Sequence, residues 1–336
     1  MTIREAVVGR PNALNLVRLV LASLVIFSHA WPIGGFGEMW GGEPPFGRWA
    51  VSSFFCLSGF LVARSRMRLG LGTFLWHRGL RIFPGAWVCL AVVTFVLAPI
   101  TLLSGGAWQP RVVAGFLLRN VDLVNLAGHL SGTVDDRVWI GSMWSLEYEL
   151  LCYFVAGLLL VGVVRKRPTL VLGVAIVGLT LYAKLTDGDW RWLLAMFVAG
   201  MFVYAISDRL PVSPWLALAC VAALVVTNQV GLEQVLWPLP LCYFVLWAGV
   251  TIPARWAPTA DISYGVYLYG FPMQIFIEWF LPGLSLVQHI VLALAVTYLV
   301  AYASWILVER PALRLKDLTW SEVKHRWHAK DLASSR

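Results

Sequence analysis

The chain is organised as a series of long apolar runs separated by short polar segments. A helix needs about 20 apolar residues to cross the hydrocarbon core of a membrane. Runs near that length, bounded by charged residues, glycine or proline, recur along the whole chain. The pattern predicts an all-α bundle of about ten transmembrane helices, at residues 13–33, 49–63, 82–104, 138–164, 169–184, 190–207, 211–230, 235–252, 262–281 and 286–308.

The composition agrees with a polytopic integral membrane protein and excludes a soluble enzyme. Hydrophobic residues make up 59% of the 336 residues, charged residues make up 13%, and the mean hydropathy is +0.75. A soluble domain carries charge on about a quarter of its residues. Because the apolar character extends along the whole chain, a soluble protein with a signal peptide or a single anchor is excluded too. We therefore expect most of the chain to lie in the lipid bilayer.

The basic residues lie in short clusters between the apolar runs, as the positive-inside rule describes. With a cytoplasmic N-terminus, 19 of the 26 basic residues fall on the cytoplasmic side and six on the outer side, and Arg18 lies within the first span. We therefore expect both termini in the cytoplasm. The net charge of +8 does not indicate a nucleic-acid partner, because the basic residues are not gathered on one solvated face.

Two units are predicted along the chain. Residues 1–316 form the transmembrane domain, and residues 317–336 form a basic cytoplasmic tail that suits a helix lying on the membrane surface. The outer loop at 34–47 is rich in glycine and proline, and the stretch at 105–137 is predicted to hold a re-entrant or interfacial segment that faces outward. The five cysteines lie inside apolar runs without metal-ligand spacing, so we expect no metal site.

The first and fourth predicted spans each hold two ionisable residues, and each of these residues indicates a functional site because burial of a charge in lipid is unfavourable. Arg18 and His29 are eleven residues apart in the first span, within about 20° of one helix face and roughly 16 Å apart along its axis. They predict a single polar track. Glu147 and Glu149 point about 160° apart, so at most one of them faces that track. A carboxylate beside His29 would prepare its ring to act as a general base.

Arg78 and Arg81 are neighbours on one face of a predicted helix. Two adjacent guanidinium groups form a receptor for phosphate oxygens, although lipid headgroup binding or a topology signal also fits this spacing. Ser58 and Gly59 stand among aromatic residues in the second span. Small residues there are typical of close helix packing.

Five short motifs occur in order along the chain. They are a basic residue with His eleven positions later (Arg18, His29), FFxxSG (Phe54, Phe55, Ser58, Gly59), RxxR with IxP (Arg78, Arg81, Ile82, Pro84), WSLxxE (Trp144, Ser145, Leu146, Glu149), and SYxxYL with a later ERP (Ser263, Tyr264, Tyr267, Leu268, Glu309, Arg310, Pro311). With these motifs the chain resembles the acyltransferase 3 family of bacterial integral membrane acyltransferases over nearly its whole length.

The resemblance implies an O-acyltransferase of the bacterial inner membrane. Such an enzyme takes an acyl group, usually acetyl, from cytoplasmic acyl-CoA and places it on a hydroxyl of an acceptor, commonly a glycan. The resemblance further implies that His29 is the catalytic residue, that Arg18 belongs to the same motif, and that Arg78 and Arg81 hold CoA.

The resemblance also distinguishes the two glutamates. Glu149 matches the glutamate of the motif and Glu147 does not, so we predict that Glu149 orients His29. Further substrate-binding or packing residues are expected at Ser58, Trp144, Tyr264 and Tyr267. Gly270 stands where the family often has histidine, so any role of that second histidine is absent or moved.

Alternatives remain open at this point. The acceptor attacks the thioester directly, or the acyl group first forms a covalent intermediate on His29 or Ser58. A proton-coupled transporter or flippase for an anionic or glycosidic solute would also use ionisable groups inside the membrane. The outer segments at 34–49 and 105–137 are the expected places for acceptor selection.

Overall fold

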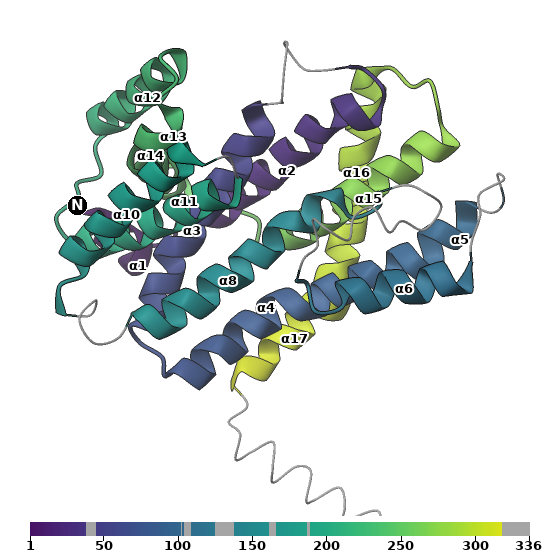
Figure 1. Cartoon of the computed structure of the whole chain (residues 1–336), viewed down its shortest axis with the longest axis horizontal. Coiled ribbons are helices and arrows are strands. Elements are labelled where there is room, and N and C mark those ends of the chain that lie inside the picture. The colour runs from purple at the N-terminus through teal and green to yellow at the C-terminus, as the bar shows by residue number, and fades with distance from the viewer. Residues whose placement is uncertain are drawn as a thin grey trace, which may run out of the picture.

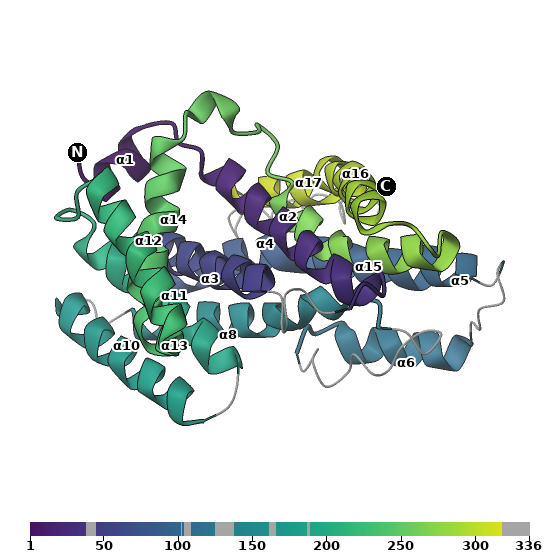
Figure 2. The same ribbon diagram turned by 90° about the horizontal axis from the view of Figure 1, so that it is seen from above.

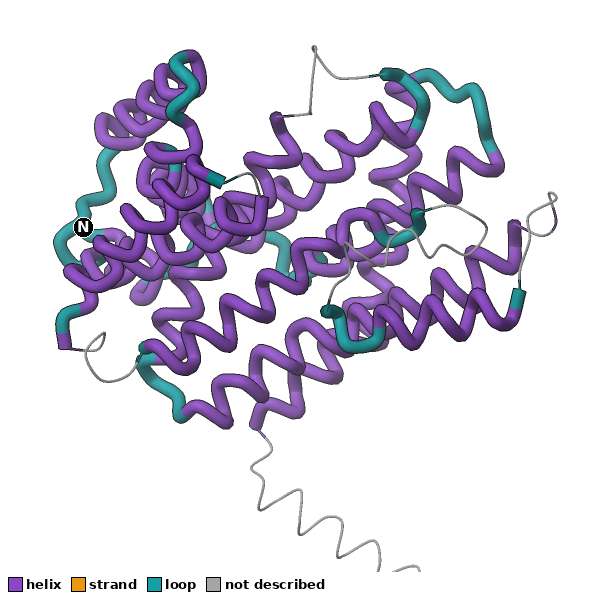
Figure 3. Tube along the Cα trace, in the orientation of Figure 1, coloured by secondary structure: helices purple, strands orange, loops and turns teal. Residues whose placement is uncertain are grey.

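The computed structural model describes residues 1–37, 45–101, 103, 109–124, 138–160, 166–186 and 189–317. Within these ranges the regular elements are helices (Figure 3), which confirms the all-α class. In chain order they are α1 (Ile3–Gly9), α2 (Leu14–Ile33), α3 (Pro45–Arg66), α4 (Leu71–Val92), the π-helix η2 (Val93–Leu97), α5 (Ala98–Thr101), α6 (Pro110–Asn120), the 3-10 helix η5 (Gly141–Met143), α8 (Trp144–Leu159), α10 (Pro168–Leu185), α11 (Asp189–Ile206), α12 (Pro214–Gln229), α13 (Glu233–Leu236), α14 (Pro238–Thr251), the 3-10 helix η6 (Ala254–Trp256), α15 (Ser263–Phe280), α16 (Leu286–Ser304), the π-helix η7 (Trp305–Glu309), α17 (Arg310–Arg314) and the 3-10 helix η8 (Leu315–Asp317).

Two groups of helices lie on either side of a central set (Figures 1 and 2). Helices α10 to α14 gather with α1 at the end that holds the N-terminus, and α5 and α6 lie at the opposite end. The central set consists of α2, α3, α4, α8 and α15. Within the bundle α3 packs against α11, and α15 packs against both α2 and α16. The first span therefore lies beside a helix that begins more than two hundred residues later in the chain.

Five helices in the described ranges are long and apolar enough to cross a membrane, which identifies a membrane protein. They are Leu14–Ile33, Phe46–Arg66, Leu71–Thr101, Pro168–Leu185 and Leu286–Arg314. Three shorter apolar helices accompany them, at Arg191–Ile206, Pro214–Gln229 and Pro238–Thr251. The number of ten spans and the side on which the termini lie stay predictions.

The helix that carries the arginine pair begins earlier than the apolar run alone predicts. The predicted span starts at residue 82, whereas α4 starts at Leu71 and continues through Pro84. The first turns of α4 mix apolar and basic side chains, so a count of apolar residues does not include them. A helix end can carry such residues at the membrane surface because long basic side chains extend their charged ends into water.

The structure describes part of the predicted outer segment at 105–137. Within the stretch at 105–137, α6 begins with Pro110 in its first turn, where proline is favoured. This helix packs against α4. The described residues do not include 38–44 of the outer loop or 318–336 of the tail, so the predicted tail helix lies outside them.

Helices α3 and α11 touch backbone to backbone at two glycines. A Cβ atom on Gly59 would lie 2.0 Å from the carbonyl oxygen of Phe197, and one on Gly200 would lie 2.1 Å from the carbonyl oxygen of Cys56. No other residue fits at these distances. The predicted close packing at Gly59 is therefore confirmed, and it fixes the position of α3 in the bundle.

Candidate functional site

Three cavities follow one another through the bundle beside α2. The arginine cavity, of about 450 Å³, is lined by Arg18, Leu61, Arg64, Ser65, Arg68, Leu69, Arg78, Arg81, Asp261 and Lys316. The central cavity, of about 110 Å³, is lined by Arg18, Val51, Phe54, Phe55, Leu57, Ser58, Leu61, Arg78, Arg81, Ile82, Ser145, Leu146, Glu149, Tyr153, Ser263, Tyr264 and Tyr267. The His29 cavity, of about 320 Å³, is lined by Val25, Ser28, His29, Pro32, Gly47, Arg48, Val51, Ser142, Trp144, Trp192, Leu193 and Tyr267. Neighbouring cavities share lining residues, so the three form one series.

Two arginines at the start of the series share a single carboxylate. Arg18 Nη1 on α2 lies 2.7 Å from Asp261 Oδ2, and Arg81 Nη2 on α4 lies 2.6 Å from the same oxygen. The other oxygen, Oδ1, accepts a hydrogen bond of 2.8 Å from the hydroxyl of Ser263. Burial alone would raise the pKa of the Asp261 carboxyl, but the charges of Arg81 and Arg18 outweigh it and lower this pKa. The carboxylate therefore stays ionised and holds the two guanidinium groups together.

Arg78, one turn before Arg81, lies among aromatic rings instead. Its guanidinium carbon is 5.6 Å from the centre of the Tyr153 ring and 6.0 Å from that of Phe74. A cation over an aromatic face is attracted by the negative charge of that face. The predicted pair is thus on one helix and lines one cavity, but its members have different partners.

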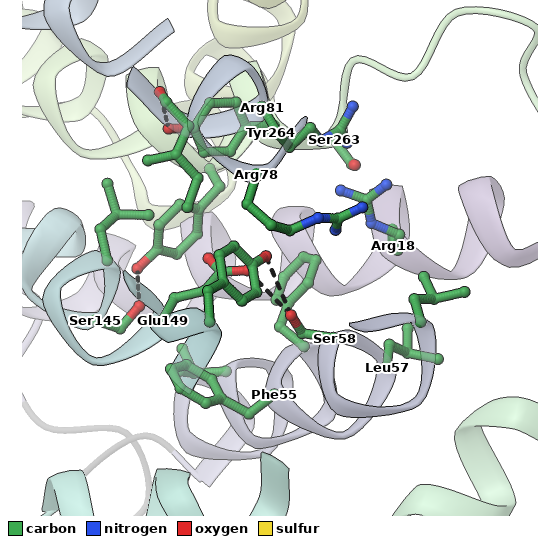
Figure 4. A pocket seen from close by; sticks show the side chains of 17 residues that line it. Arg18, Phe55, Leu57, Ser58, Arg78, Arg81, Ser145, Glu149, Ser263 and Tyr264 are labelled. Carbon is green, nitrogen blue, oxygen red and sulfur yellow. Dashed lines mark hydrogen bonds between the residues drawn. The ribbon is translucent and has the colours of Figure 1, made fainter. Parts of the chain in front are cut away.

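Glu149 on α8 belongs to the central cavity (Figure 4). Its Oε1 accepts a hydrogen bond of 3.2 Å from the hydroxyl of Ser58 and a second, short one from the hydroxyl of Tyr153. The Ser58 hydroxyl also lies 3.2 Å from the Tyr153 hydroxyl. A small polar network therefore joins α3 to α8 in the middle of the series.

Both tyrosines of the SYxxYL motif are buried and bound to neighbouring helices. The hydroxyl of Tyr264 donates a hydrogen bond of 2.8 Å to the carbonyl oxygen of Ile82. The hydroxyl of Tyr267 lies 2.7 Å from Oγ of Ser145 and also donates to the carbonyl oxygen of Ser142. These bonds join α15 to α4 and to the start of α8.

His29 lines the last cavity of the series, together with Trp144 and Trp192. Its ring meets that of Phe271 edge to face, with the ring centres 5.2 Å apart. Phe271 follows Gly270, the position where the family often has histidine. A Cβ atom on Gly270 would lie 2.6 Å from Cγ1 of Ile26 on α2. A larger residue there would require the Ile26 side chain or one of the two helices to move, so the glycine suits the close packing of α15 against the helix that carries His29.

The structure divides the predicted site residues between two neighbouring cavities. The central cavity gathers Arg18, Ser58, Arg78, Arg81, Glu149, Tyr264 and Tyr267. His29 and Trp144 line the next cavity. The carboxylate of Glu149 accepts hydrogen bonds from Ser58 and Tyr153, so these contacts do not join it to His29. Ser58 lies on α3 and Tyr153 on α8, and α8 packs against α3 and α4, whereas His29 lies on α2.

Two residues of the site escaped the sequence reasoning. Asp261 lies outside the predicted spans, where a carboxylate is unremarkable, yet its position two residues before the SYxxYL motif was a usable signal. Tyr153 is four residues after Glu149 and therefore on the same helix face. That spacing places its hydroxyl on the carboxylate.

Comparison with known proteins now bears on the chemistry of this series of cavities. The acyltransferase domain of the acyltransferase 3 family matches residues 12–307. The chain belongs to this family. Its relatives include Nodulation protein 10 of Rhizobium leguminosarum bv. viciae, which is 26% identical over 92% of this chain and 95% of that protein. An O-acetyl transferase of Shigella phage Sf6 is 26% identical over 90% of this chain and 96% of that protein. No solved structure matches the chain significantly. Membership of this family shows that the chain is an enzyme, an acyltransferase, and this favours the enzyme over the transporter that the sequence left open.

Proposed function

We propose that this acyltransferase is a membrane O-acetyltransferase that takes its acyl group from acyl-CoA, acetyl-CoA in particular, and places it on a hydroxyl of a glycan. The observation that carries the proposal is the series of cavities, which leads from a cluster of arginines to a histidine beside two tryptophans. A relative of full length is named an O-acetyl transferase, which supports acetyl as the acyl group.

The arginine cavity suits a donor that carries several phosphates. Six basic residues and a single acidic residue line it. Asp261 already neutralises part of the charge of Arg18 and Arg81, so Arg64, Arg68, Arg78 and Lys316 are the residues that we assign to the phosphates of CoA. Guanidinium groups bind phosphate oxygens in bidentate fashion, which favours a CoA thioester over a donor without phosphates.

His29 serves as the general base in this proposal. It takes the proton of the acceptor hydroxyl while the hydroxyl oxygen forms a bond to the acyl carbon. The bond between carbon and sulfur breaks, and the proton passes from His29 to the departing CoA thiolate. Glu149 acts on the donor side, because its hydrogen bonds are made in the central cavity. A covalent route through His29 or Ser58 uses the same groups in two steps.

The acceptor binds in the His29 cavity. Trp144 and Trp192 line this cavity with His29, and flat indole rings suit the faces of sugar rings. The proposed topology has ten spans with both termini in the cytoplasm of a bacterium, in its inner membrane. The positive charge of Arg64, Arg68 and Lys316 then faces the cytoplasm, where acyl-CoA is found, and the His29 cavity faces outward.

The test uses the purified full chain in lipid nanodiscs, radiolabelled acetyl-CoA and a panel of neutral oligosaccharides. We expect label on sugar in an alkali-labile ester, and His29→Gln to lower the rate by roughly 10²- to 10⁴-fold. The matched control is His289→Gln, which changes a buried histidine on α16 that lies outside the three cavities, 3.7 Å from Glu278. Transfer by His29→Gln at the wild-type rate, or sugar movement into proteoliposomes without use of acetyl-CoA, would contradict the proposal.

A further inference from the structure

We infer that Val51 and Tyr267 form a partition between the central cavity and the His29 cavity, and that this partition sets the largest acyl group that the enzyme transfers. The inference rests on the proposed function. Val51 and Tyr267 are the two residues common to the linings of both cavities. An acyl group that enters with the donor from the arginine side must therefore pass between them to reach His29.

Tyr267 is held firmly on its side of the partition. Its hydroxyl bonds to Ser145 and to the carbonyl of Ser142, and its own carbonyl accepts a hydrogen bond of 3.2 Å from the hydroxyl of Ser142. Only 8% of the residue is exposed, and the Phe54 ring meets its ring edge to face at 6.1 Å. The ring cannot swing away without breaking these bonds, so it is a fixed wall.

The helix that carries Val51, α3, is also constrained. The next residue, Ser52, accepts a hydrogen bond of 2.7 Å from the indole nitrogen of Trp192. Further along α3, the backbone contact at Gly59 prevents the helix from moving away from α11. The branched side chain of Val51 also has a strongly preferred rotamer in a helix. The width of the partition is therefore set by the sizes of the two side chains.

The small volume of the central cavity agrees with a limit on the size of the acyl group. The central cavity measures about 110 Å³, whereas the arginine cavity and the His29 cavity measure about 450 and 320 Å³. The two larger spaces have room for a nucleotide and for part of a sugar, and the middle one is narrow. One additional methylene in a tight apolar pocket changes selectivity by roughly 10- to 200-fold. A small acyl group is thus favoured by the geometry.

The test measures kcat/KM for acetyl-, propionyl- and butyryl-CoA with the oligosaccharide that wild-type enzyme acetylates fastest. Val51→Ala widens the partition, and we expect it to raise the ratio of propionyl to acetyl transfer about tenfold. Val51→Ile adds one methylene to the same branched shape and should lower that ratio by a similar factor. The matched control is Val62→Ala, on the same helix, fully buried and outside all three cavities. It removes the same atoms and should leave the ratio unchanged.

The outcomes separate the inference from the proposed function. If the wild-type enzyme transfers acetyl but neither Val51 variant changes the ratio beyond the Val62→Ala control, the partition does not select the acyl group. If the wild-type enzyme transfers no acyl group from any of the three donors, the proposed function itself fails. Retained CoA binding by each variant shows that it is folded, and Val51→Ile, the smaller change, decides the question if Val51→Ala does not fold.

Discussion

The arginine cavity and the His29 cavity lie at the two ends of one series, but they are built for different kinds of recognition. Six basic residues and one acidic residue line the first. The second has a single arginine among its lining residues and three aromatic ones, Trp144, Trp192 and Tyr267. Charge acts over a distance and is screened by salt, whereas contact with aromatic rings depends on shape. Under the proposed function the two substrates are recognised by different forces, and the binding of each can be weakened separately.

The difference also appears in what holds each end in place. At the arginine end, ionic contacts join α2 and α4 to the segment before α15 through Asp261. At the histidine end, the side chain of Ile26 on α2 packs closely against Gly270 on α15, where a Cβ atom would lie 2.6 Å from Cγ1 of Ile26. The first end depends on a carboxylate and the second on tight packing against a glycine. Substitutions at the two ends should therefore have different effects on the enzyme.

The largest of these effects is expected from Asp261→Asn. Loss of this carboxylate leaves Arg18 and Arg81 facing each other without their shared partner, and their side chains are only 20% and 16% exposed. We expect kcat/KM for acetyl-CoA to fall by roughly 10- to 100-fold and the free energy of unfolding to fall by about 1–3 kcal/mol, since an uncompensated buried charge is destabilising. Transfer kinetics and thermal unfolding in nanodiscs measure the two effects.

The control for Asp261→Asn is Asp208→Asn, which removes the partner of Arg4 from a surface pair whose aspartate is 58% exposed. Such exposed pairs contribute about 0–1 kcal/mol. Tighter binding of CoA by Asp261→Asn would show that the carboxylate competes with the donor instead of positioning the arginines.

A smaller effect, confined to the donor, is expected from the double variant Arg64→Ala with Arg68→Ala. Both residues line the arginine cavity and neither lines the central cavity. The KM for acetyl-CoA should rise about tenfold, because each guanidinium bound to a phosphate contributes roughly 1.5–3 kcal/mol at most and exposure to water reduces this. The KM for acetyl-pantetheine, which lacks the nucleotide, should stay the same.

The dependence of KM on ionic strength gives a second measurement for this prediction. Raising the ionic strength should increase the wild-type KM for acetyl-CoA and affect the double variant less. The control is Arg209→Ala with Arg255→Ala, two exposed arginines outside the three cavities. An equal loss with acetyl-CoA and acetyl-pantetheine would refute the assignment of Arg64 and Arg68 to phosphate.

The smallest effect is expected at the opposite end, from Trp144→Phe. This change keeps an aromatic ring in the His29 cavity but reduces its area, so the KM for the oligosaccharide should rise by about threefold, or roughly 0.6 kcal/mol, while the KM for acetyl-CoA stays unchanged. Initial rates with either substrate varied separate the two constants. The control is Trp256→Phe, a tryptophan that is 61% exposed. A rise in the KM for acetyl-CoA alone would mean that the two ends are not independent.

Residue spacing within single helices was predictable from the sequence. Arg78 and Arg81 lie on one helix and line one cavity, as their spacing indicates. Arg18 and His29 both line the series of cavities along α2, as their shared face indicates. These predictions succeed because the helical period fixes directions within an element. The same period shows that Glu147 and Glu149 diverge, but it does not say which helix each one meets.

Contacts between helices were not predictable in this way. The fourth predicted span was expected to present Glu149 to His29, but α8 packs so that its carboxylate meets Ser58 and Tyr153. Asp261 bonds to Arg18 and Arg81, which lie 243 and 180 residues earlier in the chain. A pattern of apolar and polar positions shows which face of a helix is buried, but it does not identify the neighbouring helix that covers this face.

The sequence by itself determined that the chain is helical and belongs in a membrane, which residues carry the unusual charges, and through its motifs the family. These properties follow from local periodicity and composition, which act within one helix at a time. The tertiary structure alone decided that the charges are divided among three successive cavities, that Asp261 holds the arginines, and that Val51 and Tyr267 line both the central cavity and the His29 cavity. Those features depend on how helices from distant parts of the chain pack, and packing is settled by the fit of side chains and glycines across interfaces.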